Sequence, residues 1–568
     1  MKFACALVVL CGLALPALAL DREAFTFTHY DLDVRVEPEQ QRLGVRGKIM
    51  LRNDSTVAQK NLVLQISSTL SWKSIQIAGK PVQFETHEYT SDIDHTGALS
   101  EAIVSLPHEV PPKGTVELEI GYEGVISLET SRLTRIGVPE DKAKHSDWDQ
   151  ISKSFTAVRG IGYVAWYPVA TEAAILSEGN SVPEAVGRWI VKHVDTTMDL
   201  VLQSTSEQAI YFSGTPSVAE VQTDSSAKTI RAFHLMKPGV NVPTFVIASY
   251  LQLPPQNSID VVYLPGQEET AKDYAEAASQ IDPAVRVEGG SGNLQILGLP
   301  EAYASPFVTQ GMLLTPLGSD LTNEAELDMV YAIARQQVQS PRAWIQEGLA
   351  HYAQAAFVEE HKGLQSALDY LNGHTAMLVD AERTAKTVAS LETAHSLVEA
   401  PDDLYLQAKS MYVWWMLKDM LGNLPTEALV NYHANEDKDP TYMPRLITTG
   451  SKRDLQWFFD DWVYHDRGLP DFRVVSVFSR PLDSGRFLVT MTLENLGRAG
   501  AEVPVLLRIE GGEVRQRVEL RGQAKTSLRI EASSKPLEVV INDGSVPESD
   551  MSNNTYKIDL LNHETLHP

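Results

Sequence analysis

The chain has 568 residues, a formal net charge of −26 and a sequence pI near 5.0. This acidic balance argues against binding to nucleic acid or to anionic lipid surfaces, because both attract basic proteins. The length is enough for several domains of ordinary size, each with its own hydrophobic core. The two cysteines, Cys5 and Cys11, both lie in a short apolar segment at the N-terminus.

Residues 1–19 have the pattern of a secretory signal peptide. Lys2 precedes an apolar run from Ala4 to Leu15, and Ala17-Leu18-Ala19 provides a small-x-small cleavage site. The sequence therefore predicts a secreted or periplasmic protein. Removal of this segment also removes both cysteines, so neither disulfides nor thiolate chemistry is expected in the mature chain. No segment reaches about 18 uninterrupted apolar residues, so no membrane span is expected.

Short alternating strands separated by turns run from about Phe25 to Leu253. They include YDLDVRV, LGVRGKIML, KNLVLQI, KSIQIAG, TVELEIGY and IVKHVDTTMDLVL. Alternation of apolar and polar residues with a period of two is typical of half-buried strands. Residues 20–253 are therefore predicted to form an all-β domain.

From about Pro254 strands first alternate with helices, and long helices then follow. SIDVVYLPG and NLQILGLP are predicted strands, whereas ETAKDYAEAASQI has the 3.6-residue period of a helix. Two further helical patterns meet at Ser340-Pro341, because proline can open a helix but disfavours helical geometry in the residue before it. Residues 254–472 are predicted to form an α/β domain with long helices.

Seven short strand patterns follow Phe472, which indicates an immunoglobulin-like β-sandwich over residues 473–568. One loop of this domain, INDGSVPESDMSNNTY, carries Asp543, Glu548 and Asp550. Their carboxylate oxygens are the kind of ligand that calcium takes in irregular loops. The alternative interpretation is a polar hairpin loop that binds no ion.

Two segments of the helical region carry a family resemblance. They are IQEGLAHY, which contains Glu347, and DLQWFFDDWVYHDRGLPDF, Asp454 to Phe472. Together with the order of β, α/β and β segments, they resemble the alanyl-aminopeptidase-like family of gluzincin metallopeptidases. The resemblance implies a multidomain α+β fold with a β saddle, a thermolysin-like α/β domain and a β-sandwich. It also implies a zinc site made by His-Glu-x-x-His on one helix and a glutamate on the next.

The residues at the implied zinc positions differ from that motif. Tyr331, Ala332 and Arg335 stand where the family has its first histidine, general base and second histidine, and only Glu347 matches. Catalytic zinc needs imidazole, thiolate or carboxylate ligands and an open position for water, together with a base. No cofactor is therefore expected, and zinc is the one metal that the resemblance makes possible.

Two further family positions also differ. In SPFVTQGML, Val308 replaces the glutamate that binds the free amine of the family's substrates. In LQAKSMYVWWML, Gln407 replaces the tyrosine that stabilises the oxyanion, and Tyr405 is two residues away. With the zinc positions, five functional positions have changed, which argues against hydrolysis.

Arg335 suggests what replaces the metal. Arginine stays charged when buried and pairs carboxylates with two N–H groups, so we expect an ion pair between Arg335 and Glu347. The alternative is that Arg335 points to solvent. A relocated metal site would use Glu347 and His351, which are spaced i, i+4 on one helix face. Candidate third ligands for that site are His361, His374 and His395.

Three hypotheses about function follow. The first is a catalytically inactive relative that binds a peptide or protein in its cleft, with Trp344 and Arg335 among the contacts. The second is a divergent zinc aminopeptidase that uses Glu347 and ligands not yet placed. The third is an adhesion module that acts through the C-terminal sandwich. The absence of His-Glu-x-x-His favours the first over the second.

Overall fold

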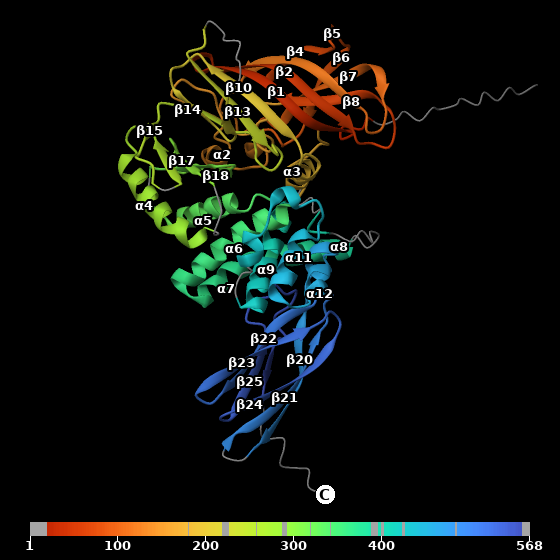
Figure 1. The fold of residues 1–568 in the computed structure, drawn as a ribbon, viewed down its shortest axis with the longest axis vertical. Coiled ribbons are helices and arrows are strands. Elements are labelled where there is room, and N and C mark those ends of the chain that lie inside the picture. The colour runs from red at the N-terminus through yellow and green to blue at the C-terminus, as the bar shows by residue number, and fades with distance from the viewer. Residues whose placement is uncertain are drawn as a thin grey trace, which may run out of the picture.

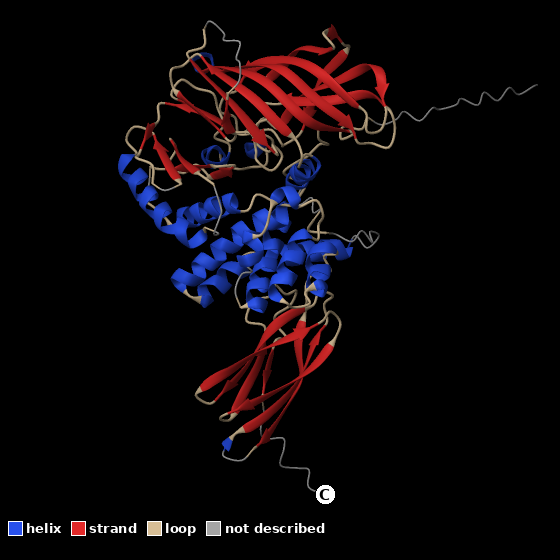
Figure 2. Cartoon of the chain, viewed as in Figure 1, coloured by secondary structure: helices blue, strands red, loops and turns tan. Residues whose placement is uncertain are grey.

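Three parts follow one another along the long axis of the molecule in this computed structural model (Figure 1). The structure describes residues 20–558, except 180, 219–225, 257, 287–291, 319, 341, 388–395, 399–402, 423–425 and 483–484. The N-terminal part is rich in strands, the middle is largely helical, and the C-terminal part again consists of strands (Figure 2). This architecture confirms the predicted multidomain α+β class. The predicted signal peptide lies outside the described residues.

The N-terminal part is built on three β-sheets. Its strands are β1 (Phe25–Glu37), β2 (Arg42–Asn53), β3 (Gln59–Ser67), β4 (Leu70–Ile77), β5 (Lys80–Pro81), β6 (Phe84–Thr90), β7 (Ala98–Val110), β8 (Thr115–Val125), β9 (Phe155–Val158), β10 (Thr197–Ser204), β11 (Ala209–Phe212), β12 (Thr215–Ser217), β13 (Thr229–Met236) and β14 (Phe245–Ala248). The sheet orders are β12-β13-β10-β1-β2-β8-β4-β5, β3-β7-β6 and β11-β14-β9. Strand β1 pairs antiparallel with β2 and parallel with β10, so it lies in the middle of the largest sheet.

Buried and exposed side chains alternate along these strands, as the period-two sequence pattern predicts. In β1 the side chains of Tyr30, Leu32 and Val34 are fully buried or nearly so, and the aspartates between them are exposed. Three short helices accompany the sheets: α1 (Ser131–Thr134), α2 (Glu140–Ser146) and α3 (Ser181–Lys192). The predicted strand IVKHVDTTMDLVL is wrong in its first half, because Ile190 to Lys192 close α3. This helix buries Val182, Ala185 and Trp189 at helical spacing.

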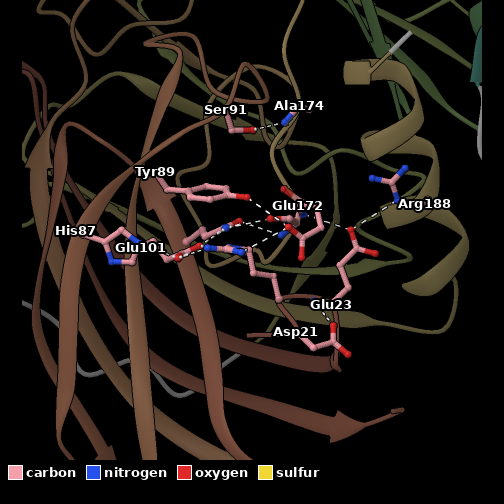
Figure 3. A network of polar contacts seen from close by, with 12 residues as sticks. Asp21, Glu23, His87, Tyr89, Ser91, Glu101, Glu172, Ala174 and Arg188 are labelled. Carbon is pink, nitrogen blue, oxygen red and sulfur yellow. Dashed lines mark hydrogen bonds and ion pairs between the residues drawn. The ribbon is translucent and has the colours of Figure 1, made fainter. Parts of the chain in front are cut away.

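The buried carboxylate of Glu101 on β7 binds the first described residues to the β3-β7-β6 sheet. Arg22 contacts Glu101 through Nε at 2.8 Å and through Nη2 at 3.1 Å. Gln65 Nε2 donates to the same carboxylate at 2.7 Å, and His87 Nε2 lies 3.0 Å from it. Figure 3 shows this network from close by. The segment that follows the predicted cleavage site is therefore anchored on the N-terminal part.

The middle part combines a small sheet with a group of helices. The strands are β15 (Leu251–Gln252), β16 (Ile259–Tyr263), β17 (Leu294–Leu299), β18 (Phe307–Thr309) and β19 (Met312–Pro316). The helices are α4 (Glu268–Val285), α5 (Asn323–Gln337), α6 (Ala343–Lys362), α7 (Leu364–Asn372), α8 (Thr375–Thr387), α9 (Asp403–Leu421), α10 (Thr426–Val430), α11 (Tyr442–Ser451) and α12 (Gln456–Phe459). Strands β16, β17 and β19 are parallel, and β18 is an antiparallel strand at the sheet edge.

Helices α5 and α6 pack against each other at the centre of the middle part. The end of α5 at Gln337 and the start of α6 at Ala343 confirm the predicted break at Ser340-Pro341. Helix α9 lies against α6 and buries Tyr412, Trp414 and Trp415 completely. In the described residues, no helix is long and apolar enough to cross a membrane.

The C-terminal part consists of two facing sheets with the orders β20-β21-β24 and β23-β22-β25-β26. The strands are β20 (Phe472–Pro481), β21 (Phe487–Asn495), β22 (Ala501–Ile509), β23 (Gly512–Leu520), β24 (Lys525–Ala532), β25 (Pro536–Ile541) and β26 (Thr555–Lys557). All seven predicted strand segments are present. Trp462 Nε1 donates to the carbonyl of Gly500 at 2.7 Å, so the last helical residues pack directly on the sandwich. The predicted domain limits at 253 and 472 stay a prediction.

Candidate functional site

Helices α5 and α6 bring the predicted ion pair together. Nε of Arg335 donates to Oε1 of Glu347 at 2.8 Å, and the Tyr331 hydroxyl donates to the other oxygen of the same carboxylate. The side chains of Arg335 and Glu347 are only 5% and 8% exposed. The expected pair between Arg335 and Glu347 is therefore present, and it is buried.

The charge of Arg335 keeps the Glu347 carboxylate ionised. Burial acts to raise the pKa of Glu347, but the Arg335 charge and the hydrogen bond from Tyr331 outweigh it and hold that pKa below its ordinary value. A buried carboxylate without such compensation would carry a large desolvation penalty. Arg335 thus supplies the positive charge that Glu347 requires at this position.

Residues of the N-terminal part cover the ion pair. Nη2 of Arg335 donates to the carbonyl of Val240 at 3.0 Å, and Nη1 lies 3.5 Å from Oδ1 of Asn241. The guanidinium therefore bridges two parts of the molecule as well as two helices. The sequence analysis did not find Val240 or Asn241. These contacts join residues about 95 positions apart, so no local pattern marks them.

His351 lies beside this centre with a defined tautomer. Its Nδ1 is 2.9 Å from Oε1 of Gln354, and Nε2 of Gln354 donates to the carbonyl of Leu327 at 3.0 Å. The second bond fixes the Gln354 amide, so Nδ1 of His351 carries the proton. Burial lowers the pKa of His351, while the Glu347 charge and the side chains of Gln354 and Gln407 act in the opposite direction. The net effect is a pKa of His351 below its ordinary value.

The histidines considered as a third metal ligand serve other contacts. Nδ1 of His361 donates to the carbonyl of Phe357 at 2.9 Å, and Nδ1 of His374 donates to that of Tyr370 at 3.0 Å. His395 lies outside the described residues. Within the described ranges, no group of three or more histidine, cysteine, aspartate or glutamate side chains is placed to hold a metal ion. The residues at the implied zinc position do not fit zinc, because a guanidinium contacts the one carboxylate there.

The two remaining positions that the resemblance singled out, Val308 and Gln407, lie on different elements. Val308 lies on the edge strand β18, where its side chain is partly buried against the α/β core. Gln407 lies on α9 close enough to His351 to affect its pKa. Tyr405 does not substitute for Gln407, because its hydroxyl donates to the Asp466 carboxylate, which also binds Lys409 at 2.6 Å. The structure therefore gathers Tyr331, Arg335, Glu347, His351 and Gln407 into one cluster.

Other predicted site residues have structural contacts. Ala332 is fully buried in the core between α5 and the sheet. The Trp344 ring is fully buried and stacks on Trp414, with ring centroids 5.7 Å apart. The predicted role of Trp344 in binding a partner stays a prediction.

The predicted calcium residues lie in the loop between β25 and β26 of the sandwich. Glu548 is buried and accepts N–H groups from Phe472 at 2.6 Å and from Asn542 and Asn554 at 2.7 Å each. Asp543 pairs with Arg515, whereas Asp550 is exposed and accepts from the backbone N–H of Ser552 at 2.8 Å. Each of the three carboxylates thus has its own partner, and calcium binding stays a prediction.

Comparisons with known proteins show what this architecture resembles. Neither a protein-family model nor a curated protein matches the sequence. Among solved structures, Legionella pneumophila aminopeptidase A in complex with aspartic acid is similar, with a TM-score of 0.55 and 14% sequence identity. The fold is aminopeptidase-like. The match covers 92% of this chain and 59% of that structure, so the chain spans less than two thirds of the length of the protein it resembles.

At this identity the likeness concerns the fold alone. The aminopeptidase-like fold agrees at a distant level with the resemblance noted in the sequence, which rested on Glu347 and the segment Asp454 to Phe472. What the cluster on α5, α6 and α9 does must be argued from its own residues.

Proposed function

We propose that the protein is an exported member of the aminopeptidase-like fold that does not hydrolyse peptides and acts by binding a peptide or protein partner. The observation that carries this proposal is the buried ion pair of Arg335 and Glu347 at the implied metal position. Zinc hydrolases need several protein ligands, an open coordination position and a base that activates water. The described cluster offers one carboxylate, and that carboxylate already binds a cation.

The remaining polar groups support the same proposal. The Tyr331 hydroxyl and the Arg335 guanidinium each bind one oxygen of Glu347, so both oxygens already accept a hydrogen bond. Val308 offers no charge to a substrate amine. The similar aminopeptidase A structure is a complex with aspartic acid, which supports the proposal that this fold offers a place for a ligand.

Metal content tests the proposal directly. The mature protein is loaded with zinc, dialysed and examined by elemental analysis beside Glu347→Ala. We expect no retained zinc in either protein and no release of product from aminoacyl or peptide substrates. Stoichiometric zinc that is lost in Glu347→Ala would instead support the divergent zinc aminopeptidase.

A restored motif provides the positive control. The triple variant Tyr331→His, Ala332→Glu and Arg335→His recreates His-Glu-x-x-His on α5, facing Glu347 on α6. If the alignment of these positions is right, this variant should retain zinc where the natural chain does not. Retention by both proteins would contradict the proposal. Retention by neither would point to a shifted alignment.

Export is tested separately. N-terminal sequencing of the protein recovered outside the cytoplasm should begin at Leu20, after the predicted cleavage site at Ala19. Arg22 and its contacts with Glu101 would then stand at the third position of the mature chain. An intact Met1 on the protein recovered from cells would contradict this part of the proposal.

A further inference from the structure

A cavity of about 210 Å³ lies between α5 and α6, next to the ends of α4 and α10. On α6 it is lined by Leu349, Tyr352, Phe357 and Glu360, which are spaced as one helix face. Glu347 is two positions before Leu349 and therefore points about 200° around the helix from it. The cavity is thus distinct from the cluster of the candidate functional site.

The walls of this cavity are mainly apolar. Val285 at the end of α4, Ala334 and Val338 on α5 and Leu429 on α10 complete the wall formed by Leu349 and Phe357. An apolar cavity of about 150 Å³ in a protein core can hold a benzene molecule. A volume of about 210 Å³ is therefore suited to one aromatic ring with a short side arm.

Each polar group of the cavity can accept a hydrogen bond. Glu360 is exposed and contributes a carboxylate, and Tyr352 contributes a hydroxyl. The third polar group is Gln337, whose Nε2 donates to the carbonyl of Ile333 at 3.0 Å while its Oε1 has no hydrogen-bond partner among the described residues. No lysine, arginine or histidine is among the described residues that line the cavity.

We propose that this cavity binds a small aromatic ammonium compound, with the ring among the apolar side chains and the ammonium group at Glu360. Apolar pockets with a few convergent polar groups are the usual form of small-molecule sites. A cation matches both the Glu360 carboxylate and the acidic character of the chain. The site does not depend on the proposed loss of hydrolysis, because neither Arg335 nor Glu347 lines the cavity.

The probe is 2-phenylethylamine, titrated calorimetrically into the full-length mature protein at pH 7, with 2-phenylethanol as a neutral analogue of the same shape. We expect one saturable site for the amine and weaker binding of the alcohol. A failure of the amine to bind at millimolar concentration would overturn the proposal. Equal binding of the alcohol would overturn the role of the charge.

Variants locate the site. Ala353→Leu with Ala356→Leu fills the cavity from α6 with residues that favour a helix, and should weaken amine binding at least about tenfold. Glu360→Gln should weaken it by about two- to fivefold, as expected for a partly exposed ion pair. The control is Glu359→Gln, which removes the same charge from the neighbouring residue that pairs with Lys418. Unchanged affinity in the filled variant with a native melting profile would overturn the assignment.

Discussion

Glu347 and Glu548 are two buried carboxylates that the sequence marks as candidate metal ligands, and the fold compensates them in different ways. Glu347 lies between a guanidinium and a tyrosine hydroxyl, whereas Glu548 accepts three uncharged N–H groups. The Arg335 charge outweighs burial and lowers the pKa of Glu347. At Glu548 burial outweighs the hydrogen bonds and raises the pKa to about 7. A buried carboxylate therefore requires compensation, but its presence in a sequence does not say which kind.

Removing Arg335, the charge partner of Glu347, should cause the largest loss in the free energy of unfolding. Arg335→Met leaves the Glu347 carboxylate buried and unpaired, and should lower the free energy of unfolding by about 3–5 kcal/mol. Urea unfolding followed by tryptophan fluorescence measures this loss. The double variant Arg335→Met with Glu347→Leu should recover most of it, since no unpaired charge remains. A loss below about 1 kcal/mol in the single variant would mean that Glu347 is not held by Arg335.

The dependence of stability on pH should separate the two carboxylates. The raised pKa of Glu548 means that the unfolded chain ionises first, so its contribution to stability is full below about pH 4.5 and is lost as the pH rises towards about 7. This loss amounts to at most about 3 kcal/mol. The lowered pKa of Glu347 acts in the opposite direction: its contribution is present above about pH 4.5 and is lost as the pH falls below that value.

Unfolding free energies measured from pH 4 to 8 check this contrast. Glu548→Gln should flatten the decline between about pH 4.5 and 7, because it removes the titrating group. The double variant Arg335→Met with Glu347→Leu should not alter that decline, since it removes both charges of the other site and leaves no unpaired carboxylate there. An unchanged slope in Glu548→Gln would show that another group is responsible.

Removing the hydroxyl of Tyr331, the second partner of Glu347, should lower the free energy of unfolding by a smaller amount. Tyr331→Phe removes a hydrogen bond to a charged acceptor and should cost about 1.5–3 kcal/mol in the free energy of unfolding. The matched control is Tyr370→Phe, which removes a 3.0 Å hydrogen bond to the neutral side chain of Gln354. We expect about 0.5–1.5 kcal/mol there. Equal losses would argue that Glu347 is not charged in the folded protein.

The smallest effect is expected from calcium at the Glu548 loop. The oxygens of Glu548 already accept three N–H groups, and Asp543 is paired with Arg515. Roughly millimolar calcium, the concentration that extracellular modules need, should therefore leave the melting temperature unchanged, as should a chelator. A calcium-dependent rise that Asp550→Asn abolishes would instead establish the predicted site at Asp543, Glu548 and Asp550.

Much of the fold could be predicted because its signals are local. The period-two patterns identified all seven strands of the sandwich, and the 3.6-residue period with Ser340-Pro341 identified α5 and α6. The start of the predicted strand IVKHVDTTMDLVL is wrong because its local signal is ambiguous. Ile190 to Lys192 are apolar or long side chains that suit a strand as well as a helix, and burial of Trp189 with the rest of the α3 face favoured the helix.

The sequence by itself showed that the zinc positions implied by the resemblance carry Tyr331, Ala332 and Arg335, and none of these is an imidazole, thiolate or carboxylate ligand. It also determined that Arg335 and Glu347 lie on successive helices. Only the tertiary structure decided that the two meet next to Val240 and Asn241, and that a separate cavity forms between the same two helices. The physical reason is that helix register and the contact between parts of the chain about 95 residues apart depend on how whole elements pack, and no short pattern encodes that packing.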